Sequence, residues 1–326
     1  MRPITGVWHA NVNSPTKRRR WLAFETRLVY TLPMARPALL DPAFVRELEA
    51  LRRRLEIRAR GGNGGDHLAK RRGSSVEFRE HRAYEPGDDL RRIDWSAYAR
   101  TGEPMLKLFR AEEDVIARIL CDTSSSMGSP DGLKLDFAKR FAAAVGYMVL
   151  ARSERVQVFS AADGLVTSPP PNRGRAGLPT FLSLLDALTA EGATNLAKAV
   201  DATVRRSQKP GLLVVVSDFF DGADILSSLK QAAFSGHQLA LVQVLSREEV
   251  DPTLEGDLAL VDAESGATIE VTMDESALVA YQSRLQALTS DLEQFAKRHA
   301  ASYLRFIASD DLAESVRAFV ETGARR

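Results

Sequence analysis

The pattern of apolar and polar positions changes along the chain and divides it into three parts. Residues 1–33 show no sustained periodicity, residues 34–113 combine one amphipathic helix with a strongly charged stretch, and residues 114–326 alternate short apolar runs with helical segments. Strands that alternate with helices predict a mainly parallel sheet covered on both faces, which is the doubly wound α/β class. We therefore expect an α/β domain at 114–326, preceded by a smaller N-terminal part.

The elements of the third part follow from the same pattern. Its apolar runs are continuous rather than alternating, as is typical of parallel strands buried on both faces. Strands are expected at 115–121, 155–159, 212–216, 239–244 and 303–307, a hairpin at 258–271, and helices at 133–151, 178–188, 195–206, 223–234, 276–298 and 312–320.

The first two parts differ in composition. Residues 1–33 contain one acidic residue, Glu25, and Met34 then opens the stretch that leads into a helix signal. We interpret residues 1–33 as a disordered extension, with Met34 as a candidate natural start. The helix begins after Asp41, which can cap it, and apolar residues recur along one of its faces until a glycine pair ends it.

A densely charged segment lies between this helix and the α/β part. Strands are expected at 75–82 and 105–109, with a turn at Glu85-Pro86-Gly87-Asp88. We interpret its charges as an ion-pair network that holds both strands to the α/β core, and the alternative is a surface that binds a partner. The residues of this network are Glu77, Arg82, Asp88, Asp89, Arg91, Asp94 and Arg100.

Composition excludes several classes of protein. Lys and Arg number 44 against 43 Asp and Glu, so the net charge of +1 gives no bulk electrostatic reason to bind nucleic acid or an anionic membrane. No apolar run reaches the ~18–20 residues of a transmembrane helix. A single cysteine, Cys121, excludes a disulfide framework, and no signal peptide is evident. We expect a cytoplasmic protein with no membrane span and no nucleic-acid partner.

Polar residues follow the expected strands where ligands bind in such sheets. Asp122, Ser124 and Ser126 come after the first strand of the α/β part, Asp218 follows a later strand, and Thr194 precedes a helix. The carboxyl ends of parallel strands meet at one edge, so these oxygens are expected to gather there. Such a set suits Mg²⁺ or Mn²⁺ and leaves room for a carboxylate from a partner. Helix capping is the alternative role for any single member.

The order of these residues resembles the metal-ion-dependent adhesion site of the von Willebrand factor A domain. A more specific resemblance, to the domain-of-unknown-function 58 family, extends from about Leu39 to the C-terminus. Its motifs are Arg72-Gly73-Ser74-Ser75-Val76-Glu77-Phe78, Arg82-x-Tyr84, Gly87-Asp88-Asp89-x-Arg91-x-Ile93-Asp94-Trp95 and Ala99-Arg100.

This resemblance implies a function as well as a fold. In the family, the charged segment precedes a von Willebrand factor A-like domain, no enzymatic activity is established, and many of the bacterial and archaeal members are encoded beside MoxR-type AAA+ ATPases. We therefore expect a magnesium-dependent adaptor or co-chaperone whose metal site receives an acidic residue from a protein partner, with such an ATPase as the candidate. On this interpretation the chain is not an enzyme.

Two alternatives stay open. A haloacid-dehalogenase-like phosphohydrolase also places an aspartate after its first strand, but its chemistry needs a second acidic residue two positions after Asp122, where this chain has Ser124. The other alternative is a structural scaffold with an empty metal site. No Gly-x-Ser-x-Gly sequence supports a serine hydrolase, the five histidines show no metal-ligand spacing, and the role of His67 stays open.

Overall fold

The computed structural model describes the chain in segments and divides it into two compact units. The described residues are 8–10, 38–61, 78–86, 88–109, 116–128, 131–162, 165–167, 169–193, 195–207, 209–220, 225–253, 256–262 and 268–324. The larger unit comprises Met1–Arg52 and Val115–Arg326, and the smaller comprises Arg53–Asp114.

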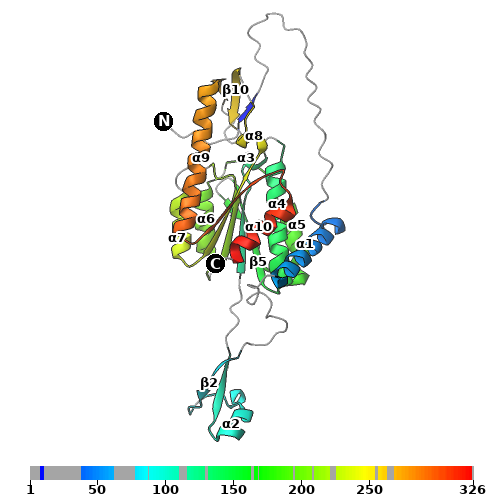
Figure 1. The fold of residues 1–326 in the computed structure, drawn as a ribbon, viewed down its shortest axis with the longest axis vertical. Coiled ribbons are helices and arrows are strands. Elements are labelled where there is room, and N and C mark those ends of the chain that lie inside the picture. The colour runs from blue at the N-terminus through cyan, green and yellow to red at the C-terminus, as the bar shows by residue number, and fades with distance from the viewer. Residues whose placement is uncertain are drawn as a thin grey trace, which may run out of the picture. The chain divides into compact units, whose positions relative to one another are not determined.

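A mainly parallel sheet forms the centre of the larger unit (Figure 1). Its strand order is β12-β9-β8-β4-β5-β6, and the order of strands along the chain reverses at β4. The parallel strands are β4 (Ile116–Asp122), β5 (Arg155–Ala162), β8 (Leu212–Ser217), β9 (Gln238–Leu245) and β12 (Ser302–Ile307). The predicted doubly wound α/β fold is therefore confirmed. Two short strands that the pattern did not indicate, β6 (Leu165–Thr167) and β7 (Asn172–Arg173), pair antiparallel with β5.

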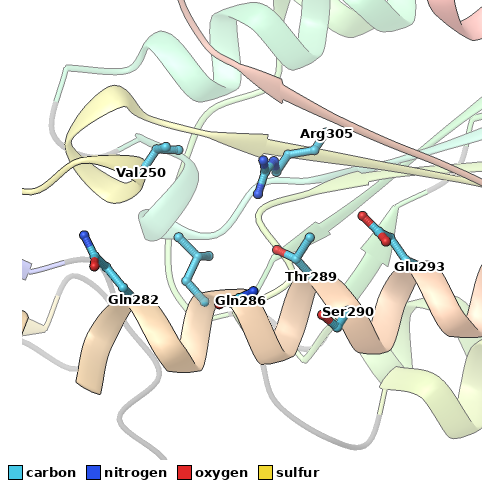
Figure 2. A pocket seen from close by; sticks show the side chains of 8 residues that line it. Val250, Gln282, Gln286, Thr289, Ser290, Glu293 and Arg305 are labelled. Carbon is cyan, nitrogen blue, oxygen red and sulfur yellow. The ribbon is translucent and has the colours of Figure 1, made fainter. Parts of the chain in front are cut away.

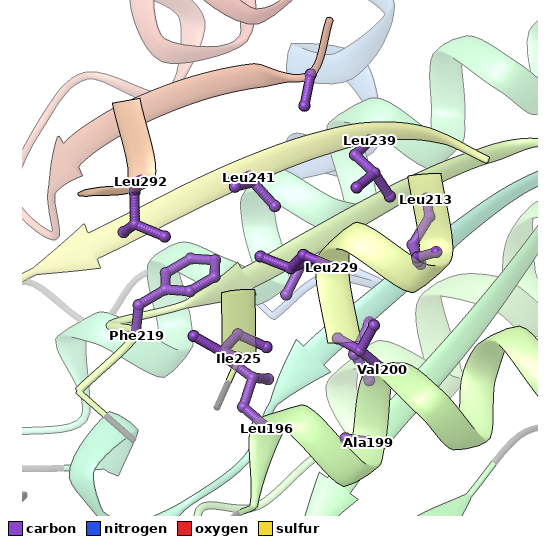
Figure 3. Packing of buried hydrophobic residues seen from close by; sticks show 14 of the residues in the cluster. Leu196, Ala199, Val200, Leu213, Phe219, Ile225, Leu229, Leu239, Leu241 and Leu292 are labelled. Carbon is purple, nitrogen blue, oxygen red and sulfur yellow. The ribbon is translucent and has the colours of Figure 1, made fainter. Parts of the chain in front are cut away.

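Helices cover both faces of this sheet (Figure 1). One face carries α6 (Leu196–Arg206), α7 (Ile225–Phe234) and α9 (Glu275–Arg298), whose apolar residues pack on the strands in one buried cluster (Figure 3). The other face carries α4 (Leu133–Ala151), α5 (Leu178–Asp186) and α10 (Leu312–Ala324). Shorter elements are α3 (Ser125–Gly128), α8 (Arg247–Val250) and the 3-10 turn η3 (Arg175–Gly177). None of the described helices combines enough length and apolar character to cross a membrane.

The first helix, α1 (Pro42–Gly61), shows why a sequence boundary need not be a structural one. Its apolar stripe is buried at Phe44 and Leu48, and the Phe44 ring lies 5.1 Å from the Arg140 guanidinium of α4. The part of α1 up to Arg52 therefore belongs to the unit that holds the sheet, although the sequence pattern groups it with the charged segment.

A second, antiparallel sheet of the larger unit contains the expected hairpin. Its strands are β10 (Gly256–Asp262) and β11 (Thr268–Met273), and β1 (Trp8–Ala10) pairs with the free edge of β10. The expectation of a disordered extension does not hold for these three residues, because the edge of β10 offers them backbone hydrogen bonds. The rest of residues 1–33 lies outside the described residues, and their assignment stays a prediction.

The smaller unit contains the charged segment. Strands β2 (Phe78–Ala83) and β3 (Met105–Phe109) pair antiparallel, close to the predicted positions. Between them lie the 3-10 turn η2 (Leu90–Arg92) and the helix α2 (Trp95–Thr101), which the apolar pattern did not indicate. The helix forms because Asp94 caps its first turn and Gly102 ends it in the left-handed conformation.

Candidate metal centre

The carboxyl ends of β4 and β8 bring four of the five predicted metal-site residues to one edge of the main sheet. Asp122 ends β4, and Asp218 follows the last residue of β8, its neighbour in the sheet. Ser124 lies between β4 and α3, and Ser126 is the second residue of α3. All four side chains are buried. The fifth residue, Thr194, lies outside the described residues.

Hydrogen bonds fix the Asp122 carboxylate and the two serine hydroxyls. The Ser124 backbone N–H donates to Asp122 Oδ1 at 3.0 Å, and the Ser217 hydroxyl donates to Asp122 Oδ2 at 2.6 Å. The Ser124 and Ser126 hydroxyl oxygens lie 2.9 Å apart and share a hydrogen bond. These contacts hold one carboxylate and two neutral oxygens close together, and that donor set is one that a hard divalent cation prefers.

The loop after β8 contributes a strained residue. Phe219 has a φ of +61°, a left-handed conformation that costs a residue with a side chain roughly 1–2 kcal/mol. Two features offset this cost: its ring is fully buried in the apolar cluster, and its backbone N–H donates to the Ser217 hydroxyl at 2.9 Å. Pairing of β8 with β4 places Ser217 near Asp122, and the turn at Phe219 adds a backbone N–H that donates to the Ser217 hydroxyl.

The electrostatics of Asp122 favour a cation. Burial and, to a lesser extent, the negative charge of Asp218 raise the pKa of Asp122 to about 6, against the hydrogen bonds from Ser217 and Ser124, which act in the opposite direction. A carboxylate that is costly to ionise when buried beside another acid gains most from a bound positive charge. The residues present therefore fit a divalent ion at Asp122.

A buried lysine and a glutamate, which the sequence analysis missed, lie beside Asp218. The Lys134 side chain is fully buried, and its ammonium donates to Asp218 Oδ2 at 2.9 Å and to Glu249 Oε1 at 2.6 Å. The available sequence signal was weak: Lys134 stands between two leucines at the start of a predicted apolar helix. Glu249 lies in α8, a single turn that the apolar pattern did not indicate.

The oxygen atoms gathered at Asp122, Ser124 and Ser126 differ from a metal site built from several charged side chains, because two of the three residues are neutral. Within the described part of the chain, no group of three or more His, Cys, Asp or Glu side chains is placed to hold a metal ion. Binding at this edge would depend on the hydroxyls of Ser124 and Ser126 together with Asp122, as the all-oxygen prediction requires.

The predicted ion-pair residues of the smaller unit have diverse roles. Arg82 Nη2 donates to both carboxylate oxygens of Asp88 at 2.7 and 2.8 Å. Asp94 accepts from the first backbone N–H groups of α2 and lies 2.9 Å from His81 Nε2, while Asp89 caps η2 through the Arg91 backbone N–H. Two of the acidic residues thus act as caps, which local hydrogen bonding favours at turns.

Three further members of that predicted network are Arg91, Arg100 and Glu77. The Arg91 and Arg100 side chains are exposed and form no ion pair with the described residues. Glu77 lies outside the part of the chain that the structure describes. Whether this surface binds a partner or holds the chain together therefore stays a prediction.

A surface pocket lies away from these residues, between α8, α9 and β12. Its volume is about 390 Å³, and none of the predicted site residues lines it. Figure 2 shows the Arg305 side chain of β12 opposite Thr289 of α9. The lining residues are Val250, Gln282, Leu285, Gln286, Thr289, Ser290, Glu293 and Arg305.

The mainly parallel sheet with helices on both faces gives the larger unit a von Willebrand factor A-like fold. The chain belongs to the family described as "Protein of unknown function DUF58", whose match spans residues 80–291, as the sequence motifs indicated. That description names no enzymatic activity. Two relatives are "Uncharacterized protein Rv1480" of Mycobacterium tuberculosis and "Uncharacterized protein Mb1516" of Mycobacterium bovis. Each is 30% identical over 285 residues and covers 86% of both chains.

Similar solved structures are more distant in sequence. The conserved hypothetical protein BatB from Bacteroides thetaiotaomicron is 17% identical with a TM-score of 0.42, over 65% of this chain and 100% of its own. A von Willebrand factor type A protein from Catenulispora acidiphila is 13% identical with a TM-score of 0.37, over 63% of this chain and 42% of its own. Proximal thread matrix protein 1 from the mussel byssus, described with a zinc-occupied MIDAS motif, is 12% identical with a TM-score of 0.41, over 65% and 48%.

Proposed function

We propose that this chain is a metal-dependent protein-binding module. The observation that carries the proposal is the state of Asp122: a buried carboxylate with a raised pKa, held beside two hydroxyl oxygens at the carboxyl edge of the sheet. Asp122, Ser124 and Ser126 would hold Mg²⁺ or Mn²⁺, and Thr194 and Asp218 are the further ligands that the family resemblance implies. The ion would supply positive charge toward a carboxylate of the partner.

The chain's own residues prepare this site before any partner arrives. Ser217 and the Ser124 backbone N–H orient the two oxygens of Asp122, and Ser124 orients Ser126. Because the donors are already in place, little side-chain ordering accompanies binding, which favours affinity. The neighbouring genes that the family resemblance implies support a MoxR-type AAA+ ATPase as the partner, with this chain as its cytoplasmic adaptor or co-chaperone.

A thermal and calorimetric titration of the full chain tests the metal. Mg²⁺ or Mn²⁺ should raise the Tm, since a ligand that binds only the folded state stabilises it by mass action. Asp122→Ala should abolish both the shift and the binding heat. Ser228→Ala is the matched control for Ser126→Ala, because Ser228 is also buried but lies in α7, so only Ser126→Ala should weaken metal binding. An equal shift in the wild type and in Asp122→Ala would refute the metal site.

Capture of the purified MoxR-type ATPase tests the partner separately. Binding should be retained in Mg²⁺, lost in EDTA and restored when Mg²⁺ is added back. Ser126→Ala should weaken it, since few contacts carry most of the affinity of such an interface. If the chain binds metal but the ATPase binds equally well in EDTA, the metal site is not the docking point. Absence of both metal and partner binding would favour the structural scaffold.

A further inference from the structure

The Lys134 ammonium occupies the space between two buried carboxylates of the larger unit. One belongs to Asp218, after β8, and the other to Glu249 in α8, and both distances, 2.9 and 2.6 Å, are those of charge-assisted hydrogen bonds. All three side chains are at most 7% exposed. Water therefore screens this arrangement very little, and each charge depends on its neighbours.

The buried ammonium and the two carboxylates compensate one another. Lys134 Nζ lies within hydrogen-bond distance of one oxygen of each acid, and the three side chains are almost fully buried together. Without the ammonium, two carboxylates would share a buried space with no opposite charge, which is the arrangement that a divalent cation relieves.

The two aspartates of the predicted metal site therefore accept hydrogen bonds from different kinds of donor. Asp218 Oδ2 accepts from a cation, and Asp218 Oδ1 accepts from the Phe220 backbone N–H at 3.2 Å. Asp122 accepts only from neutral donors, Ser124 and Ser217, and has no ion pair with the described residues. A cation that enters from solution would gain most at Asp122.

We infer that Lys134 is a built-in cation that positions Asp218 and Glu249 and thereby limits the site to one divalent ion, bound on the Asp122 side. This inference deepens the proposed function and rests on it for the role of Asp122. In the absence of Lys134, the space between Asp218 and Glu249 becomes a second position for a divalent cation.

Lys134 also connects the site to the neighbouring helices. Glu249 Oε2 accepts from the Ser246 backbone N–H at 2.7 Å, and the Glu249 carbonyl oxygen accepts from the Tyr281 hydroxyl of α9 at 2.8 Å. The Gln243 amide donates to the Asp218 carbonyl oxygen at 2.9 Å and so holds the backbone of the same loop. Loss of the ammonium would disturb Asp218 and α8 together.

The test replaces the ammonium with a neutral side chain of similar length. Lys134→Met should lower the Tm in EDTA by roughly 8–15 °C. Mg²⁺ should then raise its Tm by more than it raises that of the wild type, and calorimetry should count one more bound ion. The matched control is Lys139→Met in the same helix, where the Lys139 ammonium donates to the Asp186 carbonyl oxygen at 3.0 Å. It should leave the Mg²⁺ response unchanged.

A second variant covers the case in which Lys134→Met does not fold. Lys134→Met with Glu249→Gln removes one negative charge with the positive one, so most of the Tm in EDTA should return, while the Mg²⁺ response stays larger than in the wild type because Asp218 still lacks its cation. The inference is overturned if the folded variants show the wild-type Mg²⁺ response. A wild-type chain that binds no divalent ion refutes the proposed function. In that case the Tm response of the Lys134 variants to Mg²⁺ still tests whether Lys134 occupies a position that a divalent ion can take.

Discussion

Strand β4 carries a buried charge near each of its two ends, and the surroundings of these charges differ. At the carboxyl end, Asp122 accepts hydrogen bonds from Ser124 and Ser217, and the neighbouring carboxylates are paired with Lys134. At the amino end, Arg118 is 2% exposed, and its Nε and Nη1 have no hydrogen-bond partner among the described residues. His237 Nδ1, also buried, lacks one as well.

The two ends of β4 differ in whether the buried charged groups have hydrogen-bond partners among the described residues. At the carboxyl end the donors and acceptors satisfy one another, and the unbalanced charge is a negative one to which a cation can bind. At the amino end, burial lowers the pKa of Arg118, and a Cβ on Gly211 would lie 3.1 Å from Arg118 Nη1, so the side chain is tightly enclosed. A buried guanidinium whose Nε and Nη1 lack hydrogen-bond partners among the described residues opposes folding.

The largest expected effect is at Glu249. Glu249→Leu removes a carboxylate from Lys134 and the acceptor of the Ser246 N–H, and it should lower the free energy of unfolding by about 3–5 kcal/mol. Urea denaturation measures this loss. Glu248→Leu, at the exposed neighbouring position of the same helix, is the control and should change little. Equal, small losses of unfolding free energy in both variants would show that the contacts of Glu249 at the carboxyl end do not stabilise the fold.

Removal of the enclosed cation should act in the opposite direction. Arg118→Met should raise the free energy of unfolding by about 1–3 kcal/mol, because a buried cation whose Nε and Nη1 lack hydrogen-bond partners among the described residues is replaced by an apolar side chain of similar length. Arg305→Met, at an exposed position of β12, is the control and should be close to neutral. A destabilised Arg118→Met would mean that the guanidinium has a favourable partner in the folded protein.

The hydrogen bond between Ser217 and Asp122 should contribute less. Ser217→Ala leaves Asp122 Oδ2 and the Phe219 N–H without their partner and should lower the free energy of unfolding by about 1–2 kcal/mol in EDTA. Ser315→Ala is the control: Ser315 is also buried, but its hydroxyl donates to the carbonyl oxygen of Asp311, the residue just before α10. If both serines cost the same, Ser217 has no special role at the site.

The smallest effect is a pH dependence at the amino end. Burial lowers the pKa of His237 below 6.5, and the positive charge of Arg118 lowers it further. The folded state therefore binds this proton less readily than the unfolded chain, so the free energy of unfolding should fall as the pH decreases below 6.5. His237→Gln should remove that part of the pH dependence, and Arg118→Met should reduce it. An unchanged pH profile in both variants would contradict this origin.

The class of fold and most of the element positions could be predicted from the amino-acid sequence. The helix expected at 133–151 and the strand expected at 105–109 have those bounds in the structure. Asp122, Ser124, Ser126 and Asp218 also gather as predicted, because parallel strands end at a common edge. These features follow from the spacing of apolar residues over short stretches of the chain and from the alternation of strands with helices. Both can be recognised in the sequence.

The partners of the buried charged side chains could be identified only from the folded structure. Lys134 pairs with Asp218 and Glu249, which are 84 and 115 positions away in the chain, and no local pattern links residues so far apart. Asp94 and Asp89 also cap short helices through nearby backbone N–H groups, a role that the sequence analysis did not assign to them. Charge interactions depend on distance in space and on burial, so they were settled only when the chain had folded.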